Sequence, residues 1–194
     1  MKKILLIITI IFCIFQMIVL AIAIDIGEQA INRGSTAATG ITWVSQDNPA
    51  NASGKITSIE IWANSALVNC EVATFFVVSG NNLSTRDTHS IGAVTSGSKQ
   101  TFSGLDIDVE VGDYIGVYYT AGALERDTSG YPGGLWYRNT DAIPCTNETF
   151  TEAGGDTISL YGTGTTAVGW PHKWNTQTIS KWNTKEFTKW NGLE

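Results

Sequence analysis

The clearest pattern in the chain lies between residues 105 and 121, where apolar and polar residues first alternate and then give way to an apolar run. From residue 105 to 111 every second residue is Leu, Ile or Val, and the residues between them are acidic. This period of two is typical of a β-strand with one buried and one solvated face. Gly112 and Asp113 then predict a tight turn, because glycine tolerates positive φ and aspartate bonds its own backbone. The pattern predicts an antiparallel hairpin.

The second half of this predicted hairpin is apolar on both faces. Tyr114 and Tyr118 fall on one face, and Ile115, Val117 and Tyr119 fall on the other. A strand that buries both faces belongs in the interior of a layered structure, with cover on each side. The rest of the chain must therefore supply a second sheet.

Short runs rich in β-branched and aromatic residues recur along the chain, separated by clusters of Gly, Asn, Asp and Ser. No segment after the N-terminal apolar run has the 3.6-residue period of an amphipathic helix. We predict an all-β, antiparallel β-sandwich of jelly-roll-like type, with an immunoglobulin-like sandwich as the rival. The predicted strands span residues 24–31, 41–45, 55–63, 70–79, 88–94, 99–102, 105–111, 114–120, 135–138 and 157–161, with loops at 46–54 and 122–134.

The first 23 residues differ in composition from the rest. Two lysines precede an apolar run at residues 4–20, and Ala21-Ile22-Ala23 has the form of a signal-peptidase site. We expect cleavage of residues 1–23, which predicts a secreted or cell-surface protein. An uncleaved anchor is the alternative, because the run approaches the ~20 residues that cross a bilayer.

The last 25 residues contain an internal repeat. The sequence KWNT begins at residues 173 and 181, and KWNG begins at 189. Residues 24–169 are therefore the predicted domain and residues 170–194 a separate tail. If the tail is extended, its repeated tryptophans share one face and are expected to dock on the domain or on another copy; they are Trp174, Trp182 and Trp190.

Charge separates the same two parts, since the domain is acidic and the tail is rich in lysine. An acidic domain argues against nucleic acid and anionic membranes as its partners. After cleavage of the signal segment no membrane contact is expected. Self-association through the basic tail stays open.

Cys70 and Cys145 are the cysteines that remain after cleavage. In an oxidising compartment two cysteines most simply form one disulfide, and we predict this bond. The alternative is a pair of buried free thiols. Their long separation, with no histidine nearby, gives no zinc pattern.

Three carboxylates, Asp106, Asp108 and Glu110, share one face of a predicted strand, as the carboxylates of a retaining glycosidase do. They resemble the E-x-D-x-E motif of laminarinase-like β-sandwich glycosidases, which would make Asp106 the nucleophile and Glu110 the acid/base. Asp106 departs from the first Glu of that motif, and the domain is short for such an enzyme. A solvated strand face explains all three residues, so we expect no catalysis.

Acidic and amide side chains in the predicted loops would suit Ca²⁺, which takes oxygen ligands. Their spacing matches no calcium motif and turn chemistry explains most of them, so we expect no cofactor. The candidate ligands are Asp47, Asn48, Asp127, Asp141 and Asp156. Three N-x-S/T sequons begin at Asn51, Asn82 and Asn147.

Aromatic side chains, which stack on sugar rings, occur beside polar groups between residues 126 and 139. Trp43 and Trp62 are further aromatic candidates, although Trp62 and Trp136 would also suit the core. We predict ligand binding by Arg126, Asp127, Tyr131, Trp136, Tyr137, Arg138 and Asn139.

The stretches SIEIWANSALVNCEVATFFVVSGNNLSTRD and VGDYIGVYYTAG, together with the KWNT/KWNG tail, resemble an uncharacterised group of secreted or phage-associated jelly-roll-like domains. The resemblance implies an exported β-sandwich and no particular activity. The leading hypothesis is a non-catalytic recognition module for a glycan or cell-surface polymer. The alternatives are a structural subunit that assembles by strand addition or through its tail, and a small laminarinase-like glycosidase.

Overall fold

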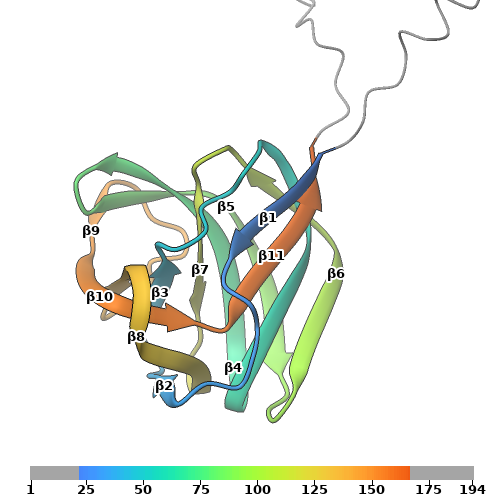
Figure 1. Cartoon of the computed structure of the whole chain (residues 1–194), viewed down its shortest axis with the longest axis vertical. Coiled ribbons are helices and arrows are strands. Elements are labelled where there is room, and N and C mark those ends of the chain that lie inside the picture. Colours follow the sequence, from blue (N-terminus) through green and yellow to red (C-terminus); the bar gives the residue numbers. More distant parts are fainter. Residues whose placement is uncertain (1–21, 167–194) are drawn as a thin grey trace, which may run out of the picture.

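The computed structural model describes residues 22–166, so residues 1–21 of the predicted signal segment and the predicted tail lie outside the described residues. The described part is all-β, with no helix and hence none able to cross a membrane. Every pairing between its strands is antiparallel (Figure 1). The strands are β1 (Ala23–Gly27), β2 (Ser35–Ala37), β3 (Thr42–Ser45), β4 (Gly54–Ser79), β5 (Asn82–Val94), β6 (Lys99–Val109), β7 (Tyr114–Tyr118), β8 (Ala121–Arg138), β9 (Glu148–Thr149), β10 (Thr151–Ile158) and β11 (Leu160–Thr165).

The strands form two layers that share β4. The first layer has the order β1-β11-β4-β6 and uses the N-terminal part of β4. The second has the order β10-β8-β3-β7-β4-β5 and uses the C-terminal part of β4, with β2 beside β8 and β9 beside β5. The pairings of β4 shift register between Ala63 and Cys70, where the strand passes from one layer to the other. One long strand thus joins the sandwich into a continuous sheet.

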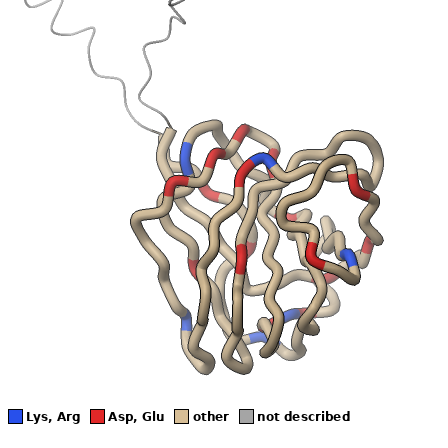
Figure 2. Tube along the Cα trace, turned by 180° about the vertical axis from the view of Figure 1, so that it is seen from behind, with Lys and Arg blue, Asp and Glu red and all other residues tan. Residues whose placement is uncertain are grey.

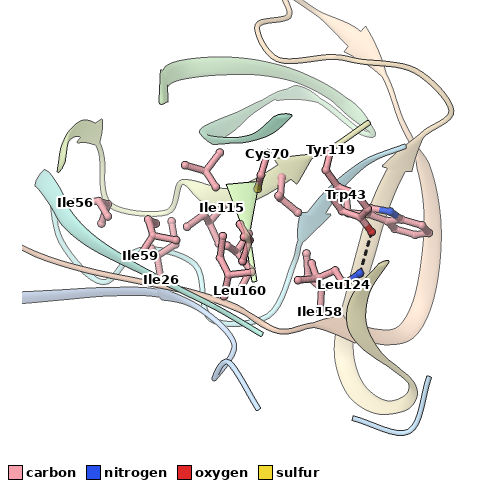
Figure 3. Packing of buried hydrophobic residues seen from close by; sticks show 14 of the residues in the cluster. Ile26, Trp43, Ile56, Ile59, Cys70, Ile115, Tyr119, Leu124, Ile158 and Leu160 are labelled. Carbon is pink, nitrogen blue, oxygen red and sulfur yellow. Dashed lines mark hydrogen bonds between the residues drawn. The ribbon is translucent and has the colours of Figure 1, made fainter. Parts of the chain in front are cut away.

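The main core lies between the layers. Ile59 of β4 and Ile26 of β1 come from the first layer, while Ile115 of β7 and Leu124 of β8 come from the second (Figure 3). Tyr119 is also fully buried there, because its hydroxyl donates to Ala37 O at 2.7 Å and accepts from the Leu124 amide at 3.3 Å.

A second hydrophobic cluster covers the outer face of the second layer, and it confirms that the strand after residue 113 is buried on both faces. Tyr114 and Tyr118 pack in this outer cluster, whereas Ile115 and Val117 lie in the main core. The cover comes from the segment after β8, which contributes the buried residues Ala142, Ile143 and Phe150.

The predicted hairpin around Gly112 is wrong, although its burial pattern is largely right. Ile107 and Val109 are buried between exposed carboxylates, but Val111 is 65% exposed. β6 and β7 both pair with β4, in different layers, and not with each other. The turn is held by Asp113, whose amide donates to Glu110 O at 2.9 Å and whose Oδ2 accepts from the Glu110 amide at 2.8 Å. It therefore carries the chain from one layer to the other.

The predicted loop at residues 122–134 is part of β8. This strand contains the positive-φ residues Gly122, Gly130 and Gly134, and its pairing with β10 shifts register near Gly155. Glycines at bulges bend a strand without ending it. A segment with this many glycines is also typical of a loop, and for this reason the sequence pattern predicted a loop here.

Candidate functional site

The residues predicted to bind ligand all lie on or directly after β8, but the structure divides them among three environments. Strand neighbours point to opposite faces of a sheet, so residues close in sequence need not share a site. Arg126, Asp127 and Tyr131 make contacts within the domain, Trp136 and Tyr137 pack on hydrophobic clusters, and Arg138 with Asn139 begins the segment that leaves β8.

Arg126, Asp127 and Tyr131 are occupied by interactions inside the domain. The Arg126 guanidinium lies 4.9 Å from the centre of the Trp43 ring and forms an ion pair with buried Asp156. Asp127 Oδ2 and the Tyr131 hydroxyl both accept from Arg33 Nη1, at 2.9 and 2.5 Å. These contacts leave little of the three side chains for a ligand.

Arg33 is the centre of this polar cluster, and the sequence analysis did not identify it. Its side chain is 1% exposed, and its Nε donates to Ser159 Oγ at 2.8 Å. Its amide donates to the buried Glu125, which also accepts from Asn64. A buried charge is tolerated only when it is paired and hydrogen-bonded, and Arg33 meets both conditions. The cluster is a structural element that ties β8 to the segment before β2.

Trp136 and Tyr137 are unsuited to stacking on a sugar at the surface. Trp136 is 6% exposed; its ring meets Tyr114 edge-on at 4.9 Å, and its Nε1 donates to Asn81 Oδ1 at 3.2 Å. Tyr137 packs on the other face of the sheet, with its ring 5.5 Å from that of Trp43. Both tryptophans of this region thus belong to hydrophobic clusters.

Arg138 borders a surface hollow that is lined by the loop after β8, as far as Glu148. The base of this loop is closed because Arg138 Nη1 donates to Thr149 O at 2.8 Å. One side is fixed to β3, where Thr42 Oγ1 accepts from the Ala142 amide at 2.9 Å. The other side is fixed to β5, where Thr85 Oγ1 accepts from the Cys145 amide at 3.0 Å. The loop is therefore fixed in place by threonine hydroxyls on two strands, which accept hydrogen bonds from its backbone amides.

The hollow measures about 450 Å³ and has a predominantly polar wall. It offers a guanidinium, two carboxylates, two hydroxyls and a thiol within one loop. Arg138 Nη2 lies 2.7 Å from Glu148 Oε2, so the cation and one carboxylate form a pair at the rim. The residues that line the hollow are Arg138, Thr140, Asp141, Ala142, Pro144, Cys145, Thr146 and Glu148.

The pKa values of two groups at or beside the hollow are raised, first by burial and then by neighbouring carboxylates. Burial and the nearby Asp141 raise the pKa of Glu71, which sits on β4. Burial also raises the pKa of the Cys145 thiol, and Glu148 adds to this effect. A neutral thiol next to acidic groups is a poor nucleophile, because the thiolate is the reactive form. The hollow is therefore better suited to holding a polar ligand than to covalent chemistry.

The predicted disulfide is wrong, since Cys70 and Cys145 are both free thiols. Cys70 lies in the main core and pairs with Gly92 of β5, whereas the Cys145 thiol donates to Leu83 O at 3.7 Å. Leu83 and Gly92 are nine positions apart on one strand, roughly 30 Å at about 3.3 Å per residue. A disulfide requires Cα atoms within ~7 Å, so the bond cannot form in this fold.

The three carboxylates that resemble a glycosidase motif lie on an open strand surface. Lys55 Nζ is 3.0 Å from Asp106 Oδ1 and 2.7 Å from Asp108 Oδ1. Glu110 is 3.1 Å from Arg86 Nη2. The side chains of Asp106, Asp108 and Glu110 are 80%, 59% and 63% exposed. These residues therefore form ion pairs across the strand surface.

The candidate Ca²⁺ ligands are dispersed. Asp47 accepts from the amides of Gly133 and Gly134 at 2.8 and 3.1 Å, and Asp156 pairs with Arg126. Asn48 fixes the edge of β1 by donating to Gly27 O at 2.9 Å. Within residues 22–166, no group of three or more His, Cys, Asp or Glu is placed to hold a metal ion.

The three sequon asparagines differ in their contacts. Asn51 is exposed, but its Oδ1 accepts from the Asp25 amide at 3.1 Å and its Nδ2 donates to Ala23 O at 3.2 Å. Asn82 donates to Asn147 Oδ1 at 3.4 Å. The side chains of all three thus contribute to turns or strand edges.

The fold defines the class: an all-β antiparallel sandwich that carries a polar hollow under a long loop. No family model matches the chain, and neither a curated protein nor a solved structure matches it.

Proposed function

We propose that this chain is an exported, non-catalytic recognition module that binds a glycan or another hydroxyl-rich surface polymer in the hollow lined by the loop after β8. The observation that carries the proposal is the composition of the wall, which combines donors, acceptors and two hydroxyls in about 450 Å³. Small-molecule sites commonly measure 300–1,000 Å³, so the hollow suits one or two sugar rings.

The Arg138–Glu148 pair supports a sugar as the ligand. Each sugar hydroxyl both donates and accepts a hydrogen bond, and a guanidinium beside a carboxylate offers both partners within a few ångströms. Thr140 and Thr146 add hydroxyls, while the exposed Pro144 supplies apolar surface for the face of a ring. The ligand would displace water and leave the loop anchors intact.

Binding is tested with the full chain on a glycan array, followed by calorimetry on each positive glycan. Thr146→Tyr places a ring in the hollow and should weaken binding at least about tenfold, which is 1.4 kcal/mol. Thr128→Tyr changes an exposed residue of β8 in the same way and should have no effect. An empty array removes the proposal, and binding that survives Thr146→Tyr places the site elsewhere.

The absence of catalysis is tested on the exposed carboxylates. Asp106 and Asp108 share one lysine partner, which favours a role in surface ion pairing. The full chain should release no reducing sugar from β-glucans above the background rate. The Asp106→Asn and Glu110→Gln variants should give the same background rate. Turnover that both substitutions abolish would establish the glycosidase alternative.

A further inference from the structure

Two aromatic side chains, Trp62 of β4 and Tyr161 of β11, lie on the outer face of the first layer. Tyr161 is directly opposite Glu60 in the β11–β4 ladder, and Trp62 lies two residues further along β4 on the same face. Diagonal neighbours of this kind are roughly 7 Å apart, within reach of two aromatic rings. Trp62 and Tyr161 are therefore adjacent on an open sheet surface.

Neither ring is needed by the core. The residues beside them in sequence, Ile61 and Leu160, are fully buried and point into the main core. Trp62 and Tyr161 are half-buried, belong to neither hydrophobic cluster, and make no ring–ring contact within the described part of the chain. Both rings therefore lie on the outer face of the sheet, partly exposed and outside the hydrophobic clusters.

The groups around the rings are small and hydroxylated or charged. Ser58, Thr101 and Thr163 point to the same face, as their registers with Glu60 and its strand neighbours require. Lys99 Nζ lies 2.9 Å from Glu60 Oε1. Lysine, glutamate and serine are depleted at the cores of protein interfaces, whereas Lys99, Glu60 and Ser58 lie beside the two rings here. Stacking with surrounding hydrogen bonds is the mode that this surface supports.

The negative charge of the domain further restricts the class of ligand. Burial is the main cause that raises the pKa of Tyr161, and the nearby carboxylates of Asp25, Glu60 and Glu28 add to this effect. Acidic residues outnumber basic ones by sixteen to six in residues 22–166, and their positions are distributed along many parts of the backbone (Figure 2). An anionic polymer would be repelled here, whereas a neutral one would not.

We propose that Trp62 and Tyr161 form a second binding platform, for an extended neutral glycan, on the face of the sandwich opposite the hollow. The ligand class rests on the proposed function, whereas the choice of Trp62 and Tyr161 rests on their position in the sheet alone. Because the hollow lies on the outer side of the second layer and the platform on the outer side of the first, the two sites would engage separate polymer strands.

The test is affinity electrophoresis of the full chain in gels that contain a soluble β-glucan, xylan or mannan, with polygalacturonate as the acidic comparison. Trp62→Ala and Tyr161→Ala should each weaken binding to a neutral polymer about five- to tenfold. Trp62→Phe and Tyr161→Phe keep a ring and should retain most of it. Thr146→Tyr, which fills the hollow, should leave platform binding in place, so failure at one site is distinguished from failure at the other.

The proposal is overturned if both alanine variants bind every neutral polymer like the parent while their melting temperatures are unchanged. It is also overturned if they leave binding intact and instead make residues 167–194 more sensitive to protease, since the face would then be covered by the chain's own tail. Tighter binding of polygalacturonate than of the neutral polymers would contradict the charge argument.

Discussion

At the scale of single residues, buried charge is the feature that most shapes this domain. Arg33 is buried with Glu125 and close to Asp127, and each of its polar groups has a partner. The hydrogen bond from the Gly34 backbone amide is the largest cause that lowers the pKa of Asp127. The hydrogen bond that Asp127 accepts from Arg33 lowers it further. Asp127 therefore stabilises the fold in its ionised form.

Asp127→Asn should reduce the free energy of unfolding by about 1–3 kcal/mol at pH 7, the size of a hydrogen bond to a charged group. Because the folded pKa is depressed, the contribution of Asp127 is present above its unfolded pKa of about 3.9 and is lost as the pH falls through the folded value. Urea unfolding between pH 7 and pH 2 should show the two proteins converge in acid. A difference that does not change with pH would contradict the ionic role of Asp127.

Cys70 and Cys145 should react as free thiols. Burial raises the pKa of Cys70 to about 12, so alkylation should label it only after unfolding, whereas half-buried Cys145 should react slowly in the folded protein. Mass spectrometry of alkylated peptides measures both, and the urea midpoint should be the same with and without reductant. A cross-linked peptide of the two cysteines in monomeric protein would contradict the fold.

At the scale of elements, the long strands β4 and β8 determine how the layers meet. β8 pairs with β4, β2, β3 and β10 along its length, and it does so by bending at glycines. Gly122 has φ of 95°, and an added Cβ would lie 2.1 Å from Ala66 O. The close approach of β8 to β4 at this point admits no side chain.

Gly122→Ala should reduce the free energy of unfolding by about 3 kcal/mol or more, because it adds a backbone clash to the ~1–2 kcal/mol of an unfavourable positive φ. Gly104→Ala is the matched control, since Gly104 has φ of 78° and nothing lies within 4 Å of an added Cβ. It should show the conformational cost alone. Denaturant unfolding of the two variants measures the difference, and equal losses would contradict the close packing of β4 and β8.

At the scale of the whole molecule, the ends of the described chain lie together. Ile22 and Thr166 are joined by two hydrogen bonds of 3.0 Å, so the segments before and after them begin at one corner of the sandwich (Figure 1).

The outer edge of β1 is occupied, because Asn48 and Asn51 bond to Gly27, Asp25 and Ala23. Assembly by adding a strand at β1 is therefore blocked, and self-association would have to use another edge or the tail.

Deletion of residues 170–194 should lower solubility or the mass of any assembly. The tail carries four lysines against an acidic domain, and burial of a tryptophan is worth a few kcal/mol. Light scattering of the full and shortened chains at low and high salt measures this, with high salt weakening the contact. Identical masses and solubilities, with the tail tryptophans fully open to quencher, would show that the tail docks nowhere.

The sequence by itself determined the properties that depend on local period. Alternation at residues 105–109 and the two apolar faces of the Tyr114–Tyr118 strand correctly indicated burial, and the turn composition indicated an all-β sandwich. These follow because side-chain direction along a strand repeats every two residues whatever the partner strand is.

Only the tertiary structure decided which strands meet. It separated Cys70 from Cys145, sent the turn at Gly112 between layers, and placed Trp136 in a cluster while leaving Trp62 on an open face. Arg33 has no marker in the sequence, since its partners Glu125, Asp127 and Ser159 lie more than ninety residues away. Such contacts depend on strand register and on the bends that glycines permit in β8, and neither is encoded in the period of a single strand.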